Sequence, residues 1–97
     1  MYRRKDIILA VDYHAENTEV RWFNGYTGEE RLLNIPTTRS GILRLMEQAI
    51  AEAAEADGQV IWIMESTTGL ARVKELIGSR MQFILANVLQ MPLPPKV

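Results

Sequence analysis

Residues 7–12 have the sequence Ile-Ile-Leu-Ala-Val-Asp, and residues 60–65 have the sequence Val-Ile-Trp-Ile-Met-Glu. In each segment an apolar run ends directly in an acid. A continuous apolar run is typical of a strand buried on both faces, as in parallel sheets. Ligands of open α/β sheets gather at the carboxyl ends of such strands. We therefore expect Asp12 and Glu65 to meet at one end of a sheet, as a divalent-metal site or as half of one, because neighbouring carboxylates repel unless a cation or a proton separates them.

The composition is that of one ordinary globular domain. Of the 97 residues, 47 % are hydrophobic and 24 % are charged, and the formal net charge is −1. This balance gives no support for nucleic-acid binding, which usually accompanies a basic surplus. The sequence has no cysteine, which excludes disulfides and thiol nucleophiles and fits a reducing cytoplasm. The apolar run behind the basic start is too short for a signal-peptide core or a membrane span, so we expect a cytoplasmic protein that does not enter a membrane.

The predicted element order is β-β-β-α-β-α-β. Strands are expected over residues 6–13, 18–23, 30–35, 59–64 and 81–86, and helices over residues 39–56 and 69–77. Three antiparallel strands followed by right-handed crossovers predict a mixed five-stranded α/β sheet of the ribonuclease H-like type. In this arrangement the first strand is central and the fourth lies parallel beside it. Residues 1–91 would form the domain, and the proline-rich residues 92–97 a linker or tail, because proline cannot donate to a sheet.

Three short motifs follow one another along this pattern. Residues 9–14 are Leu-Ala-Val-Asp-Tyr-His, residues 64–69 are Met-Glu-Ser-Thr-Thr-Gly, and residues 85–87 are Leu-Ala-Asn, with Gln90 nearby. In order and spacing they resemble the RuvC-like DEDD transposases of bacterial insertion sequences, the family that includes the bridge-RNA-guided recombinases. The resemblance covers nearly the whole chain. The chain departs from the family pattern at Ala15, where Lys is frequent, at Val88, where Pro is frequent, and by one extra residue before Gly69.

This resemblance implies the amino-terminal part of a transposase or recombinase that acts on DNA phosphodiesters with divalent metal. Asp12 would be the shared Mg²⁺ ligand and Glu65 the second ligand, and both would be catalytic. The family's last two acids are expected just beyond residue 97, since no acid follows Glu75. The ribonuclease H-like fold would then be truncated, with weak or absent Mg²⁺ binding and no activity in this chain alone. The implied partners of the full-length protein are DNA and a guide RNA. Separately, a homo-oligomer of this chain is compatible with the sequence.

Each candidate residue also has a structural interpretation. Asp12 could face solvent or cap a turn, although an acid directly after a fully buried strand is costly unless it is used. Glu65 could accept hydrogen bonds from the backbone of Thr68 and Gly69 at the next helix start. His14, the sole histidine, is either a turn residue or a ligand.

Two other functions are compatible with this order of elements. An actin-like or sugar-kinase-like ATPase half shares the β-β-β-α-β core, but those proteins place glycines after the strand-one Asp, where backbone amides approach phosphate. No glycine lies between Asp12 and Asn24, which argues against this function. The other alternative is a non-catalytic interaction module that assembles through its exposed sheet edge.

Overall fold

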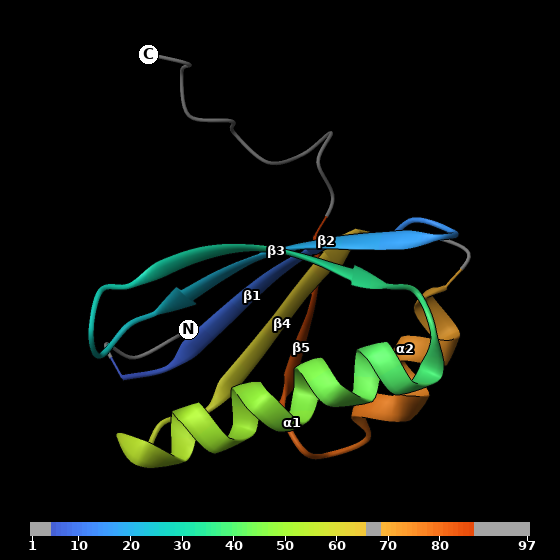
Figure 1. Cartoon of the computed structure of the whole chain (residues 1–97). Coiled ribbons are helices and arrows are strands. Elements are labelled where there is room, and N and C mark those ends of the chain that lie inside the picture. Colours follow the sequence, from blue (N-terminus) through green and yellow to red (C-terminus); the bar gives the residue numbers. More distant parts are fainter. Residues whose placement is uncertain (1–4, 66–68, 87–97) are drawn as a thin grey trace.

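The computed structural model describes residues 5–65 and 69–86, which form a five-stranded sheet with two helices (Figure 1). The strands are β1 (Ile7–Asp12), β2 (Asn17–Asn24), β3 (Glu30–Pro36), β4 (Val60–Glu65) and β5 (Gln82–Ala86), and the helices are α1 (Arg39–Glu55) and α2 (Leu70–Ile77). The strand order is β3-β2-β1-β4-β5. The β1–β2 and β2–β3 pairs are antiparallel, whereas β4 runs parallel to β1 and to β5. The predicted ribonuclease H-like order, with the first strand central, is confirmed.

The hairpin between β2 and β3 is closed by the side chain of Asn24. Its Oδ1 accepts hydrogen bonds from the backbone N–H of Tyr26 at 2.8 Å and of Thr27 at 3.0 Å. Gly28, at φ +80°, donates its N–H to the Asn24 carbonyl at 2.8 Å. An asparagine that binds the backbone two residues ahead imitates a backbone turn. This turn fixes the register of β2 against β3.

Helix α1 begins and ends at residues suited to those positions. The Thr38 hydroxyl accepts the N–H of Gly41 at 3.0 Å, which satisfies one of the free donors at the helix start. After the helix, Asp57 adopts φ +56° and the N–H of Gly58 donates to the Ala53 carbonyl at 2.8 Å. The chain thereby turns back into β4. Within the described residues, neither helix is long and apolar enough to cross a membrane.

The core lies between the sheet and the two helices, which cover the same face (Figure 1). Along β1, Ile7, Leu9 and Val11 are buried, whereas Ile8 is half-buried and Ala10 is exposed, as is Asp12. The expectation that this strand is buried on both faces is therefore wrong, because no described helix covers the other face, which we call the open face. In β4 burial extends further, and Ile61 on the open face is only 2 % exposed. Other core residues are Val20, Trp22, Ile42, Leu45, Met46, Ala49, Val60, Trp62, Met64, Val73 and Ile77.

Candidate functional site

Asp12 and Glu65 end two adjacent parallel strands. Val11 pairs with Met64, and the two acids are the next residues on β1 and β4. Because side chains of parallel strands alternate in step, both acids lie on the open face, opposite the buried Val11 and Met64. Neighbouring strands are about 4.8 Å apart. The expected meeting of the two strand ends is thus present.

A third acid, which the sequence analysis did not single out, lies in the same row. Glu19 on β2 pairs directly with Asp12, and Asn34 on β3 pairs with Glu19. The order across the open face is therefore Asn34, Glu19, Asp12 and Glu65, which we call the acidic row; all four residues are exposed. The alternation of polar and apolar residues along β2 identifies the face on which Glu19 lies, but not which β1 residue it pairs with. The short connection at residues 13–16 was the available signal for that pairing, because a tight antiparallel return restricts which residues face each other.

Asp12 is in contact with solvent and with His14. Its side chain is 63 % exposed, and its Oδ2 lies 3.0 Å from Nε2 of His14. The carbonyl of His14 accepts a hydrogen bond from the Thr37 hydroxyl at 2.6 Å, which ties this turn to the residue after β3. The burial cost that would argue for a functional Asp12 does not arise. The argument for this site therefore rests on the placement of the acids.

The start of α2 packs against the residue that follows Asp12. Gly69, the residue before Leu70 at the start of α2, is buried, and a Cβ atom at this position would overlap the ring of Tyr13. Glycine thus allows the start of α2 to approach Tyr13, the residue after β1, closely. The motif residues Ser66, Thr67, Thr68, Asn87 and Gln90 and the predicted tail at residues 92–97 lie outside the described residues.

The chemistry of the acidic row suits a hydrated Mg²⁺ ion. This ion is usually held by one or two carboxylates, with waters and substrate phosphates completing the shell. Asp12 and Glu65 would supply the two carboxylates. An open hollow of about 600 Å³ adjoins the row and is lined by His14, Ala15, Glu16, Asn17, Glu19 and Asn34. Within residues 5–65 and 69–86, no group of three His, Cys, Asp or Glu side chains is placed to hold a metal ion.

A different acid, Glu52 on α1, has a structural environment. Its Oε2 accepts hydrogen bonds from Trp22 Nε1 at 3.0 Å and Asn24 Nδ2 at 2.9 Å, and its Oε1 accepts one from Arg31 Nη2 at 2.8 Å. The Arg31 guanidinium also binds Glu29 at 2.8 Å and lies 4.9 Å from the centre of the Trp22 ring. We call these residues the Glu52 cluster. It joins α1 to β2 and β3.

Two opposing effects act on the pKa of Glu52. Partial burial raises the pKa. The hydrogen bonds from Arg31, Asn24 and Trp22 together lower it by more than burial raises it, so the pKa lies below its ordinary value. Hydrogen bonds to Glu29, the larger cause, and to Glu52 raise the pKa of Arg31. Glu52 is therefore held as a carboxylate that completes the packing of α1 on the sheet.

No protein-family model and no curated protein matches this sequence. The resemblance to the DEDD transposases therefore stays a prediction. It rests on the three motifs, of which the first and parts of the second and third lie in the described residues.

Proposed function

We propose that this chain supplies the first two metal-binding acids of a DEDD-type DNA transposase or recombinase. The observation that supports the proposal is the register of β1 and β4, which brings Asp12 and Glu65 to the carboxyl ends of adjacent parallel strands. Asp12 would be the shared ligand and Glu65 the second, and the other acids of the site would come from residues outside this sequence. The DNA substrate, and a guide RNA where one is used, would be engaged by the full-length protein in the cytoplasm.

Within this proposal the three acids of the row and His14 each have a task. Asp12 and Glu65 bind the metal ion, and His14 positions Asp12 through the 3.0 Å contact between Nε2 and Oδ2. Glu19 adds negative charge next to Asp12, which favours a cation and repels phosphate until that cation is bound. Mg²⁺, when bound, supplies charge stabilisation to the attacking and leaving oxygens of a phosphodiester. With two ligand acids, this chain alone should not cleave DNA.

Paramagnetic broadening of amide signals by Mn²⁺ tests the proposal directly. In the 97-residue chain we expect the amides at Asp12 and Glu65 to broaden first during a Mn²⁺ titration. Asp12→Asn should abolish this broadening. Glu47→Gln, which removes an exposed acid on α1, is the matched control and should leave it unchanged. Broadening centred on another part of the chain, or broadening that persists in Asp12→Asn, would contradict the metal site.

A further inference from the structure

The two edges of the sheet differ in their protection against strand pairing. The β3 edge carries Glu30 and Arg31 and ends in Pro36, and charges and proline are common means of blocking an edge. The β5 edge has neither a charge nor a proline. Its residues Ile84 and Leu85 are 37 % and 53 % exposed. Among the described strands, β4 alone pairs with β5, so within the described residues the mainly apolar β5 has a second edge that no strand occupies.

We propose that β5 pairs with β5 of a second copy of this chain, antiparallel across a twofold axis at Ile84. The pairing would join the two sheets into one. It is independent of the metal site, which lies on the open face at the ends of β1 and β4.

The sequence of β5 is suited to pairing with itself. In the proposed register Ile84 faces Ile84 of the second copy, Phe83 faces Leu85, and Gln82 faces Ala86. Apolar residues therefore meet across the axis, and no charge is brought next to a like charge. A twofold interface requires one surface to be complementary to itself, and β5 meets this condition. The corresponding pairing of β3 about Leu33 would place Glu30 opposite Pro36, which has no N–H to donate.

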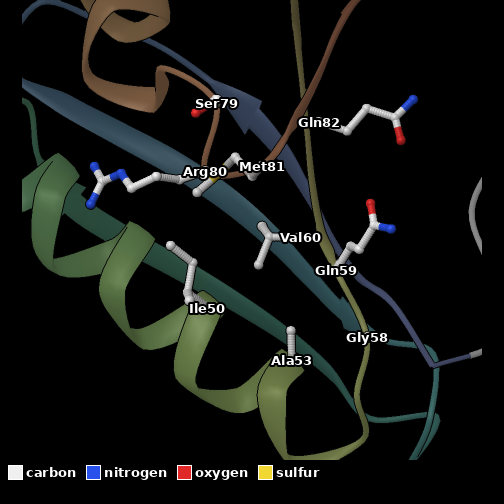
Figure 2. A pocket seen from close by; sticks show the side chains of 9 residues that line it. All are labelled: Ile50, Ala53, Gly58, Gln59, Val60, Ser79, Arg80, Met81 and Gln82. Atoms are coloured by element: carbon white, nitrogen blue, oxygen red, sulfur yellow. The ribbon is translucent and has the colours of Figure 1, made fainter.

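An open groove with a mixed polar and apolar lining lies next to the start of β5, on the side of helix α1 (Figure 2). It has a volume of about 530 Å³ and is lined by Ile50, Ala53, Gly58, Gln59, Val60, Ser79, Arg80, Met81 and Gln82. The Arg80 guanidinium is held by the Leu76 carbonyl, to which Nη2 donates at 2.8 Å. Ile50 and Met81 supply half-buried apolar surface to this groove, and the exposed side chains that line it are polar. A strand added to β5 would place its helix-side residues next to this groove.

Molar mass measured by light scattering over a concentration series tests the pairing. The 97-residue chain should approach the mass of a dimer as its concentration rises. Ile84→Lys places two lysines opposite each other and should weaken the dimer by about tenfold or more. Ile84→Glu should do the same. A mixture of the two variants should form a heterodimer, because residue 84 faces residue 84 in this register alone.

Leu32→Lys on β3 is the matched control, since Leu32 is an exposed residue of the opposite edge strand, at 69 %. It should leave the mass unchanged. A wild-type chain that stays monomeric, or a dimer that is disrupted by Leu32→Lys and not by Ile84→Lys, would overturn the proposal. Failure of the two charged variants to combine would overturn the register. Hydrogen exchange of the wild-type chain gives a test without substitution, because dimerisation should protect the β5 amides and leave the β3 amides unchanged.

Discussion

Glu52 on helix α1 and Asp12 at the end of strand β1 are both carboxylates, but Glu52 is surrounded by hydrogen-bond donors and Asp12 mainly by solvent and another acid. The Glu52 side chain is 19 % exposed and accepts hydrogen bonds from Trp22, Asn24 and Arg31. The Asp12 side chain is 63 % exposed, contacts His14, and has Glu19 as its direct neighbour on β2. The fold depends on the first carboxylate, whereas the second adds negative charge to an acidic neighbour. Acids can therefore be sorted into structural and functional candidates by the donors that surround them.

The largest expected effect is the loss of Glu52. Glu52→Ala leaves Trp22 Nε1, Asn24 Nδ2 and part of the Arg31 guanidinium without their acceptor. Buried donors without partners cost about 1–3 kcal/mol each, so we expect the free energy of unfolding to fall by roughly 3 kcal/mol in urea titrations. Glu47→Ala on the same helix should change it by less than about 0.5 kcal/mol. Equal effects of the two substitutions would show that the Glu52 cluster does not stabilise the fold.

Gly69→Ala should have the next largest effect. The added Cβ overlaps the Tyr13 ring, so the ring or the start of α2 must move. Overpacking of this kind costs about 1–3 kcal/mol. In the double variant with Tyr13→Ala, the loss caused by Gly69→Ala should shrink, because the ring is no longer present. If the two losses simply add in a double-mutant cycle, the close approach at this position is not a constraint.

The pH dependence of stability should carry a smaller contribution from Glu52. Because its folded-state pKa lies below the ordinary 4.5, its stabilisation is complete above about 4.5 and is lost as the pH falls through the folded-state value. Wild-type protein should therefore lose more stability between pH 5 and pH 3 than Glu52→Ala loses, as measured by urea unfolding at each pH. Glu47→Ala should follow the wild-type curve. Parallel curves for wild type and Glu52→Ala would remove Glu52 as the source of acid sensitivity.

The element order and the adjacent positions of Asp12 and Glu65 at the strand ends were predictable from the sequence, because both depend on local patterns and on the parallel pairing of β1 with β4. The exposure of Asp12 depends on the layers instead. From β3 to β4 and from β4 to β5 the chain moves in the same direction across the sheet, so two right-handed crossovers place both helices on one face. Asp12 lies on the opposite face, which neither helix covers.

The Glu52 cluster was not predictable in this way. Its hydrogen bonds join α1 to residues on β2 and β3 that lie 21 to 30 positions away in the sequence. No periodicity or short motif indicates such contacts. Glu19 is an intermediate case, because its face follows from alternation but its position opposite Asp12 requires the register of the β1–β2 turn.

The smallest expected effect, and the one that separates the two kinds of acid most directly, is the loss of charge at Asp12. Asp12→Asn removes repulsion between Asp12 and its neighbours Glu19 and Glu65, so in metal-free buffer the free energy of unfolding should stay unchanged or rise by about 0.5–1 kcal/mol. Glu65→Gln should act in the same direction. Added salt should reduce the difference, since exposed charges are screened.

Divalent metal should reverse the comparison. Mg²⁺ that binds the folded chain stabilises it by mass action, so wild type should gain thermal stability on titration and Asp12→Asn should not. Glu30→Gln, an exposed acid of the β3 edge, is the control and should respond as wild type does. Suppose instead that Asp12→Asn and Glu65→Gln each lose about 1–3 kcal/mol without metal, the loss expected when buried donors lose an acceptor. The two acids would then belong with Glu52 as parts of the fold, and the acidic row would no longer support a metal site.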